Sequence, residues 1–337
     1  MARHPWVAKA DAGVRFGVQV AAMRRRTTQL DVTLHDDPLG VLMDAGRLID
    51  SLGYDGLFLH DHPSFSPDPW IGLAGLAVAT ERVMLGSVVV CEPYRHPTLV
   101  ARMATDLDNL SRGRFMLGLG IGWAVPEFAA LGKSFDSVKV RQSQLVESVE
   151  IVKGLWTGEP FSYSGKHYAI EDVRIDPRPI QQPAPPLMIA GGGEKVTLRQ
   201  VARYADACNF GDPVQAESPF TRDLLAGTAE IRDRLDVLKR HCEAVDRPYD
   251  EILRTHFVSW LMVAPTEAEA RAKFRSYFGD EIPPTGRGVV LGTPEQITEY
   301  YRARADAGMQ YFIYQLLDGK DHETIRLMAE EVMPNVR

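Results

Sequence analysis

The sequence is poor in cysteine, with three among 337 residues. Cys91, Cys208 and Cys242 lie far apart, are odd in number and show none of the spacings of a metal site. This excludes a disulfide framework of the kind that supports small secreted domains, and it is typical of a protein from a reducing compartment.

Long apolar runs are also missing. The longest, residues 83–90, is far shorter than the roughly 20 residues that a membrane-spanning helix needs. The first ten residues lack the apolar core of a secretory signal. We therefore expect a soluble, cytoplasmic protein that does not enter a membrane.

Positive charge is not in excess, because 38 Lys and Arg residues face 45 Asp and Glu residues and the net charge is −7. The longest basic tract is the triplet Arg24, Arg25 and Arg26. A domain that binds nucleic acid typically carries a basic patch or stripe. The charge balance therefore argues against a nucleic-acid partner, and we expect a small-molecule substrate instead.

What the sequence does contain is a regular alternation of strand and helix patterns in a chain of globular composition, 45% hydrophobic and 25% charged. Short apolar runs predict eight strands, at residues 15–20, 54–59, 83–90, 114–120, 187–190, 207–210, 253–263 and 310–314. Apolar residues at helical spacing predict helices at residues 38–52, 70–80, 99–110, 145–156, 194–204, 219–245, 266–278, from 293 onward and at 321–332. Thr266 with Glu269, and Thr293 before a proline, are typical helix starts.

Eight strand–helix units without a break in composition predict an α/β fold, a (β/α)8 TIM barrel forming one domain over residues 1–337. A doubly wound sheet is the alternative, but its glycine-rich turn is absent after the first predicted strand. The glycines at 118, 120 and 122 follow the fourth strand, and residues 123–126 do not read as a clean helix start.

Two stretches read as insertions. Residues 157–186 are rich in proline and suggest an extended excursion with a hairpin at 161–168. Residues 278–290 form a late loop that contains two prolines and three glycines. Long loops of this kind in a compact barrel are commonly lids or binding loops.

Polar and small residues gather where the predicted strands end, which is where a barrel places its active site. They are Gln19, His60, Asp61, His62, Cys91, Glu92, Tyr94, Arg95, Gly120, Gly122, Trp123, Gly191, Gly192, Gly193, Asn209, Gly211 and Gln315. His60 and His62 have three interpretations: metal ligands, polar residues at a strand end, or a histidine that transfers a proton to or from a bound cofactor. The three glycines at 191–193 suit close approach of an anion or a flat ring, although a simple tight turn explains them too.

Five stretches of the sequence form a recognisable series. They are LGYDGLFLHDH at residues 52–62, LGSVVVCEPYRHP at 85–97, LDNLSRGRFMLGLGIGW at 107–123, PLMIAGGGE at 186–194 and LGTPEQ at 291–296. In these stretches the chain resembles the bacterial luciferase-like monooxygenase superfamily, and more narrowly its branch of oxidoreductases that use the deazaflavin coenzyme F420. The matches run in order over nearly the whole chain.

The resemblance implies a (β/α)8 barrel with an insertion after strand four, where residues 157–186 lie. It implies a non-proline cis peptide in strand three, and the matching pair is Val88 and Val89. Deazaflavin members carry Asp-His at the end of strand two, which Asp61 and His62 match, so the resemblance favours F420 over FMN.

The activity implied is hydride transfer between F420 and a small organic substrate, with His62 as the catalytic acid or base and no metal. The cofactor-binding residues implied are Asp61, His62, Val88, Val89, Cys91, Gly120, Gly122, Ala190, Gly191, Gly192, Gly193, Asn209 and Gly211. The substrate is expected against Gln19, Tyr94, Trp123 and Gln315.

Two alternatives remain. One is an FMN-dependent monooxygenase that needs a partner reductase, and the other is a cofactor-binding barrel without catalysis. Sugar-phosphate dehydrogenases of the branch carry a glutamate after the strand-four glycines, where this sequence has Trp123. We therefore expect an apolar or aromatic substrate rather than a sugar phosphate. By the same resemblance we expect a homodimer.

Overall fold

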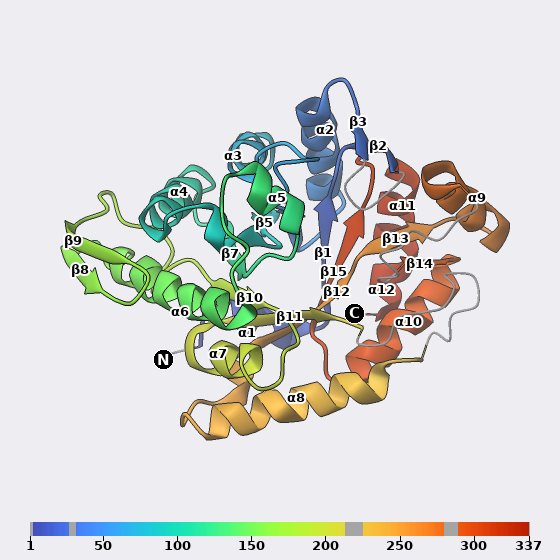
Figure 1. Cartoon of the computed structure of the whole chain (residues 1–337). Coiled ribbons are helices and arrows are strands. Elements are labelled where there is room, and N and C mark those ends of the chain that lie inside the picture. The colour runs from blue at the N-terminus through green and yellow to red at the C-terminus, as the bar shows by residue number, and fades with distance from the viewer. Residues whose placement is uncertain (1–2, 27–31, 213–224, 280–288, 337) are drawn as a thin grey trace.

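A closed ring of parallel strands forms the centre of the computed structural model, which describes residues 3–26, 32–212, 225–279 and 289–336 (Figure 1). In the order of their pairing the ring strands are β1 (Arg15–Val20), β4 (Gly56–Leu59), β5 (Met84–Ser87), β7 (Phe115–Gly120), β10 (Leu187–Ala190), β11 (Ala207–Gly211), β12 (Leu253–Val258) and β15 (Tyr311–Leu316). Pairing of β15 with β1 closes the ring. The predicted (β/α)8 barrel is confirmed.

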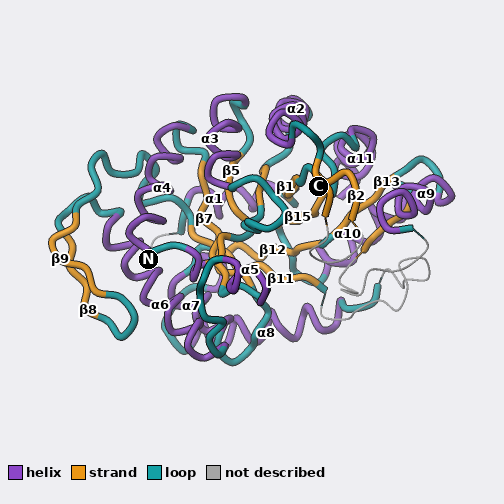
Figure 2. Tube along the Cα trace, turned by 45° about the horizontal axis from the view of Figure 1, so that its top comes forward, coloured by secondary structure: helices purple, strands orange, loops and turns teal. Residues whose placement is uncertain are grey.

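Helices surround the ring, as Figure 2 shows. They are α2 (Pro38–Ser51), α3 (Pro69–Ala79), α4 (Pro97–Leu110), α6 (Val138–Leu155), α7 (Thr197–Tyr204), α8 (Thr228–Glu243), α10 (Pro294–Asp306) and α11 (His322–Leu327). A further helix, α9 (Glu267–Phe278), begins with the predicted capping box of Thr266 and Glu269, and Thr293 caps α10 as predicted. Among the described helices, none has the length and apolar character needed to cross a membrane.

Two apolar layers hold the barrel together. Between the ring and its helices lies the larger layer, to which outward-facing residues such as Phe16 and Val18 belong. A second layer fills the ring from inside: Phe58, Met84, Met116, Met188, Leu253, Tyr311 and Ile313. Trp6, on the short helix α1 (Pro5–Ala8), packs against this inner layer. Because side chains alternate between the two faces of a strand, a ring strand such as β15 contributes to both layers, with Phe312 and Tyr314 outside and Tyr311 and Ile313 inside.

Of the two predicted insertions, the structure describes the first in full and the second only at its ends. In the first, β8 (Phe161–Ser164) and β9 (Ala169–Val173) form an antiparallel hairpin that extends beyond the predicted 161–168. Residues 280–288 of the predicted late loop, and residues 219–224 at the start of the helix predicted over 219–245, lie outside the described residues.

Several elements differ from their predictions, and two strands differ most. The strand predicted at residues 83–90 ends at Ser87, and a shorter strand, β6 (Val90–Cys91), follows the Val88–Val89 peptide. That peptide bond is cis, as the family resemblance implies. The strand predicted at 253–263 breaks after Val258. Its second part, β13 (Trp260–Val263), pairs with β14 (Val289–Gly292) in a separate two-stranded sheet.

Two further differences concern the last predicted helix and an early hairpin. The helix predicted over residues 321–332 passes from α11 through a π-helical turn, Met328–Val332, into α12 (Met333–Val336). The segment between the first strand and α2 contains an unpredicted antiparallel pair, β2 (Met23–Arg26) and β3 (Val32–Leu34).

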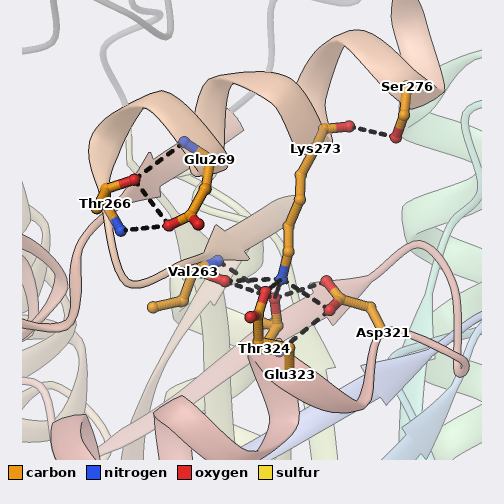
Figure 3. Close-up of polar contacts among 8 residues, drawn as sticks. All are labelled: Val263, Thr266, Glu269, Lys273, Ser276, Asp321, Glu323 and Thr324. Atoms are coloured by element: carbon orange, nitrogen blue, oxygen red, sulfur yellow. Dashed lines mark hydrogen bonds and ion pairs between the residues drawn. The ribbon is translucent and has the colours of Figure 1, made fainter.

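One lysine joins α9 to the rest of the molecule (Figure 3). The Lys273 ammonium donates to the carbonyl oxygen of Val263, at the end of β13, over 2.8 Å. It also lies 2.8 Å from carboxylate oxygens of Asp321 and Glu323 and 3.1 Å from the hydroxyl of Thr324. A single ammonium therefore holds together α9, α11 and the outer sheet that contains β13.

Replacing Lys273 with methionine is expected to lower the free energy of unfolding by about 1–2 kcal/mol, because it leaves partly buried acceptors without their donor. Urea unfolding followed by circular dichroism measures the change. The matched control is Lys139→Met on α6, where the lysine is exposed and a change near zero is expected. Equal midpoints for the two variants would show that the Lys273 contacts add nothing to stability.

Candidate active site

The carboxyl end of the ring is where the polar side chains point inward. Gln19, Asn209 and Gln315 lie at or near the ends of β1, β11 and β15. Asn209 and Gln315 each follow a residue of the inner layer by two positions, namely Ala207 and Ile313, and so face the same way. The apolar filling of the ring is therefore replaced by amide groups at this end.

Two adjoining cavities open at this end, and all the residues predicted to bind the cofactor or the substrate line one or both. Glu92 and Arg95, which were also predicted at a strand end, line neither. The smaller, of about 210 Å³, is lined by Gln19, His60, Asp61, His62, Val88, Val89, Cys91, Tyr94, Gly122, Trp123 and Gln315 among the predicted residues. The larger, of about 700 Å³, is lined by Val88, Val89, Gly120, Gly122, Trp123, Ala190, Gly191, Gly192, Gly193, Asn209 and Gly211. Val88, Val89, Gly122 and Trp123 belong to both linings, so the cavities share a wall.

His62 is held by a carboxylate that the sequence interpretation missed. Its Nδ1 lies 2.8 Å from Oε2 of Glu127, on the short helix α5 (Val125–Ala130). The Tyr94 hydroxyl donates to the same oxygen over 2.9 Å. The Glu127 side chain is fully buried, whereas that of His62 is partly exposed. His62 thus contacts the cavity while its inner nitrogen is fixed from behind.

The charge state of Glu127 decides which nitrogen of His62 carries a proton. Burial raises the pKa of this carboxyl, but hydrogen bonds from His62 and Tyr94 outweigh the burial and lower the pKa overall. An ionised carboxylate only accepts hydrogen bonds, so Nδ1 must be the donor. The other nitrogen, Nε2, is then left to accept or return a proton on the cavity side.

Glu127 was missed for a local reason. The family pattern places a glutamate directly after the strand-four glycines, where this chain has Trp123, and residues 123–126 were not predicted to begin a helix. In the structure α5 begins at Val125, and Pro126 occupies its first turn, where proline is well tolerated. This one helical turn carries Glu127 back to His62.

Aromatic rings surround His62. The Phe65 ring stacks on its imidazole with centroids 4.5 Å apart and planes 20° apart. The Trp123 ring meets it edge-on at 5.3 Å. Phe65, Phe257 and Trp260 line the smaller cavity but were not predicted as site residues, because nothing in the sequence pattern separates them from core aromatics. These rings make the smaller cavity largely aromatic.

Asp61 and Cys91 line the smaller cavity but are engaged with the protein. The Asp61 carboxylate accepts from the Arg95 guanidinium over 2.6 Å and from the Cys91 backbone N–H over 3.0 Å. Burial raises the pKa of Asp61 while Arg95 acts against that rise. Burial also raises the pKa of the Cys91 thiol, which disfavours a reactive thiolate. Both residues therefore shape the site rather than react in it.

The larger cavity has the features of a cradle for an acidic, flat ligand. Asn209 is buried, and its Nδ2 has no hydrogen-bond partner within the described part of the chain. A Cβ added at Gly192 would lie 2.8 Å from the guanidinium of Arg234, on α8. A Cβ added at Gly120 would lie 2.7 Å from Val89. Glycine at these two positions thus leaves space that the side chains of Arg234 and Val89 occupy, and the cavity is lined by backbone, an amide donor and a cation.

Histidine and carboxylate groups do not assemble into a metal site in the described ranges, where no cluster of three or more His, Cys, Asp or Glu side chains could hold an ion. His60 and His62 lie with ring centroids 5.4 Å apart. His62 is paired with Glu127, and His60 Nδ1 lies 3.4 Å from the Gln315 amide.

The chain is similar to known proteins over most of its length. Residues 14–313 match the family model of luciferase-like monooxygenases. The F420-dependent glucose-6-phosphate dehydrogenase of Microbacterium testaceum (strain StLB037) is 28% identical over 320 residues, which cover 88% of this chain and 93% of that protein.

Two solved structures share the fold. An F420-dependent secondary alcohol dehydrogenase in complex with an F420–acetone adduct superposes with a TM-score of 0.77 at 17% identity, covering 96% of this chain and 99% of that one. The oxygenating constituent of 3,6-diketocamphane monooxygenase of Pseudomonas putida, in complex with FMN, gives 0.73 at 17% identity over 96% and 99%. At such identities the likeness concerns the fold alone.

Proposed function

The chain belongs to the luciferase-like monooxygenase family, and from this premise we propose that it is an F420-dependent oxidoreductase that transfers a hydride between the deazaflavin and a small organic substrate. The naming of F420 in a relative that spans nearly the whole chain supports this choice of cofactor. The observation that carries the proposal is the pairing of His62 with Glu127 at the wall of a cavity that adjoins a glycine-lined cradle.

The larger cavity would hold the cofactor. Gly191, Gly192 and Gly193 offer backbone to it, Asn209 offers an amide donor, and Val88 with Val89 forms the wall toward the smaller cavity. Arg234 supplies a positive charge for an acidic part of the ligand. When bound there, F420 supplies a ring carbon that gives or accepts a hydride.

His62 would move the compensating proton. With Nδ1–H directed at Glu127, its Nε2 accepts a proton from a substrate hydroxyl or returns one to a substrate carbonyl. Glu127 stabilises the imidazolium that forms after a proton is accepted, and Tyr94 keeps Glu127 in place. Phe65, Trp123 and Trp260 exclude water from the smaller cavity.

Replacing Glu127 with glutamine is expected to lower kcat about 100-fold, with a smaller change in KM, because the amide no longer fixes the proton and the orientation of His62. Steady-state turnover with F420 measures both constants. Glu171→Gln, on the exposed face of the β8–β9 hairpin, is the matched control and should leave both unchanged. Unchanged kcat in the Glu127 variant would remove the positioning role.

The experiment that tests the proposed function is a titration of the protein with F420 and, separately, with FMN, followed by quenching of tryptophan fluorescence. Micromolar or tighter binding of F420 together with F420-dependent turnover supports the proposal. Binding of FMN alone would favour the second candidate, a monooxygenase that works with a separate reductase, whose fold is the one seen with FMN in the diketocamphane enzyme. Binding of neither would end both.

We also propose a homodimer, because one helix is apolar on all sides yet partly exposed. Ile71 and Val78 on α3 are 63% and 75% exposed, and Leu99 on neighbouring α4 is 58% exposed. A helix with apolar residues all round is normally buried. Light scattering should give a dimer for the native chain and a monomer for Val78→Asp, while Val138→Asp on α6 stays dimeric. A monomeric native chain would contradict this.

The cytoplasm is the proposed location. Cys91, Cys208 and Cys242 are all free and buried thiols, as expected for a reducing compartment. A fluorescent fusion of the chain found outside the cytoplasm would contradict the assignment.

A further inference from the structure

The size and the charge of the smaller cavity limit which molecules can bind in it. The inference drawn from them rests on the proposed function, because it takes this cavity as the substrate site. Its volume is about 210 Å³. An apolar cavity of about 150 Å³ is enough to hold benzene. A substrate that fits inside therefore has one ring, or two small ones.

The walls favour a flat molecule. Phe65, Trp123, Phe257 and Trp260 all contribute rings to the lining, and Val88 and Val89 close the side shared with the larger cavity. Ring–ring contacts of this kind favour stacked or edge-on flat groups. An aliphatic chain of the same volume would bury less area against them.

The wall that contains Trp260 is firmly placed. Trp260 begins β13, which pairs with β14 from Trp260 to Val263. Lys273 binds the Val263 carbonyl at the other end of that strand (Figure 3). The aromatic wall is thus part of a supported sheet, so the cavity keeps its narrow shape.

The charges of the lining disfavour an anion. Among the described residues no Lys or Arg lines the smaller cavity, and Asp61 is the acidic residue that does. The guanidinium of Arg95 lies outside this lining and is paired with Asp61 at 2.6 Å and with Asp68 at 2.9 Å. Within this described lining, a phosphate or carboxylate would be desolvated without a Lys or Arg partner, which is costly. The cation of the site, Arg234, lines the larger cavity instead.

Most polar side chains of the smaller cavity are hydrogen-bonded within the protein. The Gln19 amide donates to the Val88 carbonyl. The other engaged members of the lining are His60, Asp61, Tyr94 and Gln315, which leaves His62 and Ser259 for a ligand. This set suits a single carbonyl or hydroxyl oxygen and not the several hydroxyl groups of a sugar.

We infer that the substrate of this enzyme is an uncharged, flat compound of one or two rings that carries one carbonyl or alcohol group, and that it is not a sugar phosphate. Reduction of such a carbonyl adds a hydride from reduced F420 at carbon and a proton from His62 at oxygen, and the proton that F420 releases as it becomes oxidised restores that of His62. Oxidation of the alcohol is the reverse, so atoms and charge balance without another reactant.

The test uses benzamide and benzoate, which have nearly the same shape and differ in charge. Each is titrated calorimetrically into the full-length protein, with and without F420, and glucose 6-phosphate is the third probe. We expect benzamide to bind at least tenfold more tightly than benzoate and glucose 6-phosphate not to bind. Tighter binding of benzoate or of glucose 6-phosphate, or no binding of benzamide, would overturn the inference.

A variant that adds a charge to the wall of the smaller cavity shows whether benzamide binds in that cavity or elsewhere. Trp123→Arg places a cation in the wall at a position that is 41% exposed. It should reverse the preference toward benzoate by tenfold or more. Val125→Arg adds the same charge two residues away, outside the lining, and should keep the native preference. Equal behaviour of the two variants would place the ring site elsewhere and overturn the inference.

The two proposals fail separately. F420 binding with turnover of glucose 6-phosphate would overturn the substrate class and keep the F420-dependent activity. Benzamide selectivity that Trp123→Arg reverses, in a protein that does not bind F420, would keep the ring site and remove the proposed function.

Discussion

Replacing His62 with alanine is expected to lower kcat by about 10²–10⁴-fold, the usual contribution of general acid–base catalysis. The expected loss is large because His62 lines the smaller cavity and Glu127 fixes its Nδ1, which leaves Nε2 for proton transfer. Affinity for F420 should remain close to that of the native protein. Turnover and fluorescence titration of the same preparation measure the two quantities.

The control for this variant is His322→Ala, an exposed histidine at the start of α11 that should leave turnover unchanged. Loss of turnover with retained F420 binding excludes a cofactor-binding barrel without catalysis. If His62→Ala turns over at the native rate, another group moves the proton. If it loses F420 binding as well, His62 acts chiefly by holding the cofactor.

The largest expected effect on stability comes from a buried ion cluster beside the larger cavity. Arg304 on α10 is fully buried, and its Nε and Nη2 donate to the two carboxylate oxygens of Asp212, each over 2.9 Å. His256 Nε2 lies 2.8 Å from the same carboxylate, and the Tyr300 hydroxyl donates to it over 2.7 Å.

Arg304→Met should lower the free energy of unfolding by about 3–5 kcal/mol, because it leaves the buried Asp212 carboxylate without its main counter-charge. Chemical unfolding at neutral pH measures the loss. Arg302→Met, two residues away and exposed, is the matched control and should cost under about 1 kcal/mol. A loss below about 1 kcal/mol for Arg304→Met would mean that the cluster rearranges around Asp212.

The same cluster predicts a pH dependence. Burial raises the pKa of Asp212, but His256 and Arg304 outweigh it and hold the pKa well below its ordinary value. A carboxyl with a lowered pKa in the folded state stabilises the fold above its unfolded pKa of about 3.9, and the stability is lost as pH falls below that value. Native stability should therefore fall steeply below about pH 4, and less steeply in Arg304→Met.

The barrel was predictable because its strands are short apolar runs separated by amphipathic helices. The first strand matches its prediction at residues 15–20. The strand predicted at 253–263 is interrupted at Ser259, and its sequence pattern does not show that the second half pairs in a separate sheet. The run at residues 83–90 likewise gave no internal sign of its interruption, and only the family resemblance placed the cis peptide at Val88–Val89.

Site residues were predictable where their position at the end of a strand is enough to place them in the site. Residues at the carboxyl ends of parallel strands must meet at one face, so His62, Trp123 and Gln315 could be grouped before their contacts were known. Glu127 and Arg234 could not, since each reaches the site from a helix, and a charged residue on a helix is usually solvated. These two residues differ from other charged residues by contacts far apart in the sequence, such as that of Glu127 with His62, which a sequence pattern does not show.

The outer sheet of β13 and β14 has a consequence for evolution. Trp260 lies on this sheet and not on the hydrogen-bonded ring, whereas Val88, Val89 and the glycine cradle belong to the ring strands and their ends. Substitutions at Trp260 can change the cavity without breaking a ring hydrogen bond or touching the cradle. Descendants of this chain can therefore acquire new substrates while the barrel and its cofactor stay the same. Substrate selectivity is then the property of the enzyme most free to diverge.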